Sequence, residues 1–173
     1  MTLGGATSLE TVDTSLVLVP LGSTEQHGPH LPLDTDTRIA TAVGRALAAR
    51  FGDGWLLAPA LHYGASGEHE GFDGTISIGT TVLQLLLIEY GRSACNWAGR
   101  LVFVNGHGGN LDALADLLDH LADALEGHIK HRVRGIEVIV SDELETVIER
   151  ITHGPAVDQA PKVLSAFVER YAR

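Results

Sequence analysis

Two short apolar runs, each followed at once by imidazole and carboxylate side chains, constrain the fold of this chain more than any other feature. Leu16–Leu21 precedes GSTEQHGPHLPLDTD, and Leu101–Val104 precedes NGHGGN. Short runs of this kind are typical of strands that are buried on both faces of a parallel sheet. Because open α/β sheets bind ligands at the carboxyl ends of their strands, both polar segments are predicted to converge on one cleft.

The spacing of apolar residues along the chain alternates between strand and helix. Strands are expected at Leu16–Leu21, Trp55–Pro59, Leu101–Val104 and Ile136–Val140. Helices are expected at Thr35–Phe51 (with Ile39, Val43 and Leu47 at steps of four), Thr81–Trp97, Leu111–Leu125 and Pro161–Tyr171. Residues 62–80 are rich in glycine and predict a long loop, with a short strand near Ile76–Ile78. This alternation favours an α/β fold with right-handed parallel crossovers.

Length and composition favour one globular domain over residues 1–173, of which 45% are hydrophobic. The net charge of −10 and the lack of a basic stripe argue against nucleic acid as a partner. The single cysteine, Cys95, excludes an internal disulfide framework and is expected to be a buried, inert thiol. The pattern of a signal peptide and an apolar run of membrane-spanning length are both missing, so we expect a cytoplasmic protein without a membrane partner.

Four residues of the two polar segments combine the ligand types of a metal site: Glu25, His27, Asp36 and His107. Imidazole and carboxylate without thiolate suit zinc, manganese or iron, and a carboxylate can bridge two ions. Glu25 and His27 are two residues apart on an extended segment, so both side chains can face the same side. Alone, each is more often an ordinary polar residue than a ligand, and NGHGGN would also serve as a plain strand-to-helix turn. Their joint placement favours a metal site.

Three segments resemble the creatininase (creatinine amidohydrolase) family: STEQHGPHLPLDTD at 23–36, SGEHEGFDGTISIGT at 66–80 and NGHGGN at 105–110. The similarity covers about residues 16–126 and implies a three-layer αβα sandwich with a mostly parallel sheet. It also implies two divalent metal ions per chain, zinc or else iron or manganese. Their ligands would be Glu25, His27, Asp36 and His107, with Asp36 shared by both ions. The family commonly assembles as hexamers or related homo-oligomers.

The same resemblance implies a metal-dependent hydrolase of a carbon–nitrogen bond. The residues of the motifs most resemble those of family peptidases that release a C-terminal Val-Tyr unit from a small modified precursor peptide. Two alternatives stay open: a creatinine-type or other small-molecule amidohydrolase, and a non-catalytic, truncated relative.

Two departures from the family pattern bear on activity. Asp73 stands where the family usually has proline, so the loop that contains it is expected to be looser or shifted. The family's later Glu-Thr-Ser segment, preceded by His-Ala-Gly, completes the metal site and is not recognisable here. ELETV at 143–147 contains Glu145 and Thr146, but it lies in a helical pattern and lacks the His-Ala-Gly. The part after Gly127 therefore reads as a truncated or divergent end.

Other polar residues and one helix carry weaker predictions. His69 lies in the loop that the family folds over its metal site, where it either binds substrate or shuttles a proton, or is merely solvated. His30 is expected to hold the turn beside the metal motif through a hydrogen bond. Surface positions are expected for His62, His120, His128, His131 and His153. Because the helix at Thr81–Trp97 is apolar on more than one face, we expect a homo-oligomer.

Overall fold

The described strands form one parallel sheet with the order β2-β1-β3-β4. The computed structural model describes residues 1–14, 16–50, 54–117 and 136–140. The strands are β1 (Leu16–Leu21), β2 (Trp55–Leu57), β3 (Leu101–Asn105) and β4 (Ile136–Val140). β1 pairs in parallel with both β2 and β3, and β3 pairs in parallel with β4. The predicted parallel sheet is confirmed.

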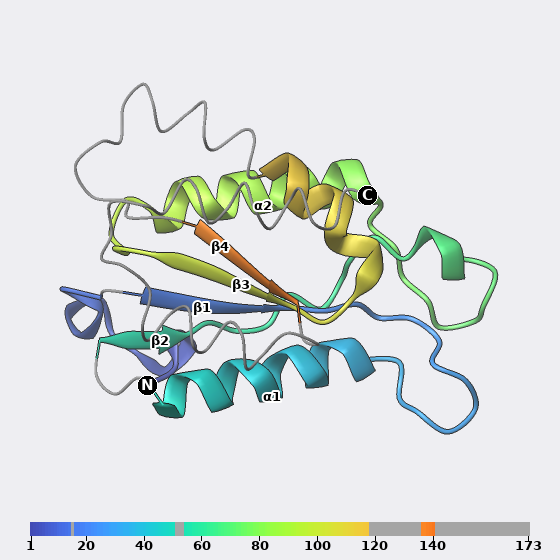
Figure 1. Ribbon diagram of the computed structural model, residues 1–173, viewed down its shortest axis with the longest axis horizontal. Helices are drawn as coiled ribbons and strands as arrows, with labels where there is room; N and C mark the ends of the chain where they lie inside the picture. Colours follow the sequence, from blue (N-terminus) through green and yellow to red (C-terminus); the bar gives the residue numbers. More distant parts are fainter. Residues whose placement is uncertain (15, 51–53, 118–135, 141–173) are drawn as a thin grey trace.

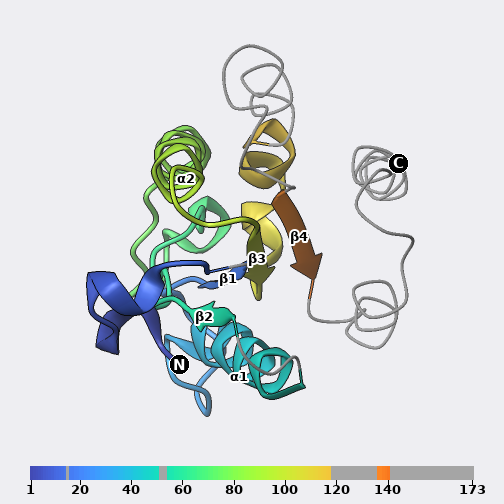
Figure 2. The ribbon, with the colours of Figure 1, turned by 90° about the vertical axis from the view of Figure 1, so that its left-hand side faces the viewer.

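Helices cover both faces of this sheet (Figure 1). Helix α1 (Thr35–Arg50) lies against one face, and α2 (Thr80–Ala94) lies on the opposite side. The same layers are visible after a turn of 90°, with the helical residues 111–117 on the side of α2 (Figure 2). The arrangement is therefore the three-layer αβα sandwich that the family resemblance implied. None of the helices in the described part of the chain is long and apolar enough to cross a membrane.

The two faces of the sheet bury separate apolar clusters. Every residue of β1 and β3 is buried, as expected for strands between two helical layers. Alternate residues of β1 belong to different clusters because successive side chains of a strand point to opposite faces. The cluster on the α2 side includes Val17, Val19, Leu21, Leu83, Leu87 and Phe103. The cluster on the α1 side includes Leu16, Leu18, Leu47, Val102 and Val104. Cys95 is buried in the α2 cluster, and burial raises the pKa of its thiol, as an inert thiol requires.

Two details of the predicted elements are wrong. Ile39 is 43% exposed, and α1 instead buries the small residues Ala40 and Gly44 with Leu47. A Cβ atom on Gly44 would lie 3.0 Å from Leu57 Cδ1, so the helix approaches the sheet too closely for larger residues there. No strand forms at Ile76–Ile78: the amide of Ile76 donates to the carbonyl of Thr24 and that of Ile78 to the carbonyl of Gly64, so no continuous ladder arises.

The other expected elements agree with the structure to within a few residues or lie outside the described residues. The strand expected at Trp55–Pro59 ends two residues earlier, and α2 begins and ends slightly before its predicted bounds. Residues 111–117 are helical, as the stripe beginning at Leu111 predicted. The helix expected at Pro161–Tyr171 and the segment ELETV lie outside the described residues.

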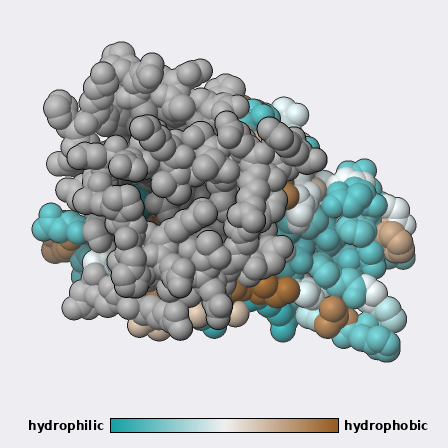
Figure 3. All heavy atoms as spheres, viewed as in Figure 1, coloured by the Kyte–Doolittle hydropathy of each residue, from teal (hydrophilic) through white to brown (hydrophobic). Residues whose placement is uncertain are grey.

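Glycines let the start of α1 touch the ends of both central strands. Gly22 directly follows β1, and a Cβ atom there would collide with the backbone N and Cα atoms of Thr37. Gly106 directly follows β3, and a Cβ atom there would lie 2.5 Å from the carbonyl oxygen of Asp36. The first turn of α1 is thus held against the carboxyl edge of the sheet. At that end of the molecule the visible surface is mostly hydrophilic, with separate apolar spots (Figure 3).

Gly22→Ala should lower the free energy of unfolding by about 1–3 kcal/mol or more, because the added methyl group meets backbone atoms that cannot rotate away. The matched control is Gly71→Ala, since nothing lies within 4 Å of a Cβ atom at that position. Urea denaturation followed by circular dichroism would measure both. Equal stability of the two variants would contradict the close approach.

Candidate metal centre

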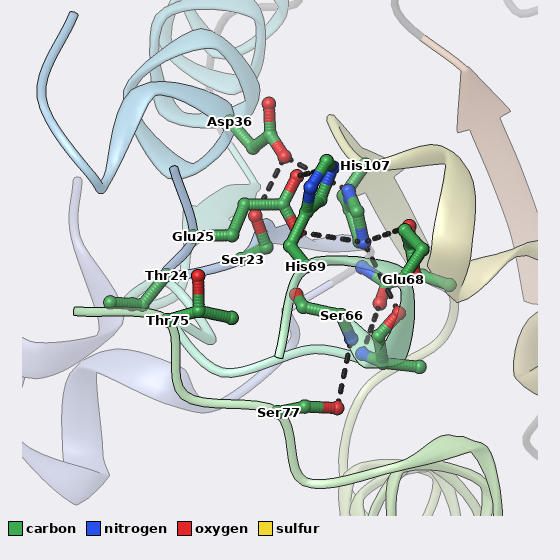
Figure 4. A network of polar contacts seen from close by, with 12 residues as sticks. Ser23, Thr24, Glu25, Asp36, Ser66, Glu68, His69, Thr75, Ser77 and His107 are labelled. Atoms are coloured by element: carbon green, nitrogen blue, oxygen red, sulfur yellow. Dashed lines mark hydrogen bonds and ion pairs between the residues drawn. The ribbon is translucent and has the colours of Figure 1, made fainter. Parts of the chain in front are cut away.

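The segments that follow β1 and β3 bring their polar side chains to one point beside α1. Glu25 and His27 follow β1, Asp36 lies in the first turn of α1, and His107 follows β3. Figure 4 shows Glu25, Asp36 and His107 pointing toward one another, with His69 and Glu68 reaching in from the loop between β2 and α2. All four predicted ligands therefore converge, as the placement of the two motifs predicted.

Asp36 lies between the two histidines. Its Oδ1 atom is 2.8 Å from His27 Nε2, and its Oδ2 atom is 3.0 Å from His107 Nδ1. The hydroxyl of Ser23 donates a hydrogen bond of 2.7 Å to Oδ2. The other nitrogen of His27, Nδ1, is 3.1 Å from the carbonyl oxygen of Glu25. A proton on Nδ1 would be donated to that carbonyl, which leaves the Nε2 lone pair facing the carboxylates.

Glu25 lies between the same two histidines on the other side. Its Oε1 atom is 4.0 Å from His27 Nε2, and its Oε2 atom is 3.3 Å from His107 Nε2. Ligand atoms of Glu25, His27 and Asp36 all lie within 4.8 Å of one another, and so do those of Glu25, Glu68 and His107. Glu25 thus belongs to two groups of potential ligands. The sharing of Asp36 by two ions stays a prediction. The position of Glu25 in both groups would allow its carboxylate to be shared in the same way.

The carboxylates of the cluster attract positive charge. Burial by itself would raise the pKa of Asp36, but hydrogen bonds with His107, Ser23 and His27 lower it to about 2. Burial by itself would lower the pKa of His107, but the hydrogen bond to Asp36 and the charge of Glu25 raise it. Burial by itself would also lower the pKa of His27, but the hydrogen bonds to Asp36 and to the backbone of Glu25, together with the charges of both carboxylates, raise it. Protons on the imidazoles or a bound cation can supply the positive charge that this environment favours.

One atom tests whether these residues fit a cation. Glu25 is only 3% exposed, and its Oε2 atom has no hydrogen-bond partner. A buried carboxylate oxygen is costly unless it is paired or coordinates a metal. The surrounding donors are imidazole nitrogens and carboxylate oxygens, a set that suits zinc, manganese or iron. The residues present therefore fit divalent metal ions.

His69 lies at the rim of the cluster. It ends the short 3₁₀ turn Gly67–His69, and its Nε2 atom is 3.6 Å from Glu25 Oε1. Its Nδ1 atom is 3.1 Å from the side-chain amide nitrogen of Gln26. The side chain is 28% exposed, so it borders both the carboxylates and the solvent. A substrate-binding or proton-shuttling role for His69 stays a prediction.

The sequence reasoning missed Glu68 as part of the cluster. Glu68 Oε1 is 3.6 Å from His107 Nε2. The signal was ambiguous because Glu68 and Glu70 flank His69 equally, and only the path of the loop shows which of them turns inward. Of the remaining histidines, His30 and His62 are exposed. The others, His120, His128, His131 and His153, lie outside the described residues.

Two asparagines of NGHGGN hold the segments that carry the ligands. Asn105 donates from Nδ2 to the carbonyl of His107 at 2.8 Å. Asn110 donates to the carbonyl of Gly22 at 3.1 Å and accepts from the amide of Ala65 at 3.0 Å. Asn110 is fully buried, so it joins the end of β1, the end of β3 and the loop after β2. Both asparagines thus bind backbone atoms and hold the ligand-bearing segments in place.

The chain is thus an α/β protein, a parallel αβα sandwich with a candidate metal site of histidines and carboxylates at its strand ends. Residues 6–163 match the family model described as Creatininase: Creatinine amidohydrolase. The chain belongs to the creatininase family, as its motifs predicted.

Individual relatives agree with this assignment. The chain is 66% identical over 120 residues to the mycofactocin precursor peptide peptidase of Mycobacterium ulcerans, a match that covers 65% of this chain and 48% of the relative. It is 36% identical over 101 residues to the creatinine amidohydrolase of Pseudomonas putida, with coverage of 53% and 37%. A solved mutant creatininase of Zn-Zn type superposes with a TM-score of 0.69 at 27% identity, covering 90% of this chain and 65% of that one. The chain spans about half the length of the curated relatives it matches.

Proposed function

We propose that this chain is a metal-dependent hydrolase of an amide or peptide bond, with two divalent cations held by Glu25, His27, Asp36 and His107. The observation that carries the proposal is the buried Oε2 atom of Glu25, which has no hydrogen-bond partner and faces His107 in a cluster of two histidines and two carboxylates. Zinc is the first candidate, because a related creatininase is of Zn-Zn type and the donor set suits it. Iron or manganese would suit the same donors.

The chain's own residues would divide the work of hydrolysis. A pair of divalent ions supplies a polarised carbonyl and an activated water. Asp36 and Glu25 hold their negative charge in a buried setting, and the backbone contact of His27 orients its ring. His69 borders both Glu25 and the solvent, so its Nε2 atom could pass a proton between the reacting group and bulk water.

The substrate that we propose is the mycofactocin precursor peptide, from which the enzyme would release the C-terminal Val-Tyr unit. The support is the 66% identity to a peptidase of that name, against 36% to a creatinine amidohydrolase. A small-molecule amidohydrolase is the second candidate, because the metal cluster itself does not distinguish a peptide bond from another amide.

We also propose that the chain forms a homo-oligomer, with a hexamer implied by the family resemblance, through α2. Val82, Leu85 and Leu86 are 54%, 59% and 36% exposed, and their spacing puts them on one face of the helix. Burying such a patch against a second copy would remove apolar area from water.

Replacing His27 or His107 by alanine should remove most of the bound metal and leave the apolar clusters intact, since neither side chain belongs to them. His62→Ala is the matched control, because this exposed histidine lies outside both ligand groups. Elemental analysis after gel filtration gives the metal content, and circular dichroism checks the fold. Wild-type metal content in both site variants would refute the ligand assignment.

Added zinc, manganese or iron(II) should produce cleavage of a peptide that ends in Val-Tyr, and a chelator should abolish it. Asp36→Asn should reduce the rate by about a hundredfold or more, because it replaces a negatively charged ligand of the cations with a neutral one. Mass spectrometry of the products and a parallel assay of creatinine separate the two substrate classes. If no metal supports turnover while the chain binds metal normally, the non-catalytic alternative holds.

Leu85→Lys should shift the oligomer toward smaller species, because a charge would then be buried in the proposed interface. Leu9→Lys is the control, as Leu9 is also exposed but lies far from α2 in the sequence. Light scattering at micromolar concentration measures the mass of each. A wild-type monomer would end the proposal.

A further inference from the structure

We propose that Glu68 is a ligand of one of the two cations, together with Glu25 and His107, so that metal binding fixes the loop between β2 and α2 over the site. The inference rests on the proposed metal centre and adds a residue to it. The added ligand comes from the loop around Gly67–His69, whereas the other proposed ligands lie in the two segments that follow β1 and β3.

The distances suit a cation surrounded by these three side chains. Glu25 Oε2 is 3.3 Å from His107 Nε2, and His107 Nε2 is 3.6 Å from Glu68 Oε1. Ligand atoms of the three residues all lie within 4.8 Å of one another. Bonds of about 2.1 Å in a tetrahedral site place neighbouring ligand atoms about 3.4 Å apart. Two of the three edges therefore already have the length that a zinc ion needs.

A second observation points to a ligand at the same place. Glu25 Oε2, the atom that faces His107, is buried and has no hydrogen-bond partner. Its other oxygen, Oε1, faces His27 and His69 instead. The Nδ1 atom of His107 is 3.0 Å from Asp36, and its Nε2 atom faces Glu25, Glu68 and, at 3.2 Å, the carbonyl oxygen of Ala65. With the proton of the ring on Nδ1, where Asp36 accepts it, the lone pair of Nε2 would point toward the two carboxylates. One cation between these three atoms would satisfy the buried oxygen.

Gly109 leaves the space that Glu68 enters. A Cβ atom on Gly109 would lie 2.6 Å from His107 Nε2 and 3.0 Å from Glu68 Oε1. Any side chain at position 109 would therefore compete with the Glu68 carboxylate for its place beside the imidazole. The glycine keeps this corner open to a ligand from the neighbouring loop.

The loop is anchored at its base but not at Glu68. The amide of Ser66 donates to the Ser77 hydroxyl at 3.0 Å, and the amide of His69 donates to the Ser66 carbonyl at 3.0 Å. The Glu68 side chain itself is 52% exposed, and among the described residues it forms an ion pair with His107. A cation would add a strong contact at the one point where the loop meets the cluster, so metal should order the loop.

The test compares Glu68→Gln with Glu70→Gln, a matched exposed glutamate of the same loop that is outside both ligand groups. The metal-free full chain is titrated with zinc chloride in a calorimeter, and hydrogen exchange of residues 66–79 is measured with and without zinc. Wild type and Glu70→Gln should bind two ions and protect the loop. Glu68→Gln should bind one ion as before, bind the second at least about tenfold more weakly, and lose the protection.

Each result has one meaning. Two ions of unchanged affinity in Glu68→Gln, with the loop protected as in wild type, would overturn the role of Glu68 and leave the metal centre standing. A wild-type chain that binds no zinc would overturn both. Equal losses in Glu68→Gln and Glu70→Gln would show an effect of loop charge and also refute a specific ligand.

Discussion

Compensation of buried negative charge is the constraint on which the rest of this structure depends. Asp36 and Glu25 are both nearly inaccessible to solvent at the edge of the sheet. A carboxylate in such a place is stable only with hydrogen bonds or positive charge around it. His27 and His107 supply these contacts from two segments that are far apart in the sequence. The start of a helix also favours the negative charge of Asp36, which lies in the first turn of α1.

The fold serves this cluster by bringing three backbones unusually close. Glycine at 22 and 106 removes the Cβ atoms that would separate α1 from the ends of β1 and β3. The buried amide of Asn110 then ties those ends to the loop that carries Glu68 and His69. The apolar clusters on the two faces of the sheet hold the helices against the strands, and this fixes the start of α1 beside the strand ends. Loops placed on a rigid scaffold of this kind commonly carry binding residues.

The strands and helices could be predicted because local periodicity reports burial. Leu16–Leu21 and Ile136–Val140 were predicted with the bounds that the structure has, since the first is a continuous apolar run and the second is apolar at every position except Glu137. Ile39 was misjudged because the close contact of α1 with the sheet admits only small residues, and a pattern of large apolar residues does not show that distance. The segment at Ile76–Ile78 has strand-like composition, yet its amides bind two separate loops.

The sequence by itself determined the family, the α/β layers and the convergence of Glu25, His27, Asp36 and His107, because ligand types that follow parallel strands must meet at one edge. Only the tertiary structure decided which atoms face each other. Glu68 and Glu70 are equivalent in the sequence, and the turn at Gly67–His69 directs Glu68 toward His107. The tertiary structure also leaves Glu25 Oε2 buried without a hydrogen-bond partner. Such contacts depend on how loops cross in space, and residue spacing along the chain carries no record of that path.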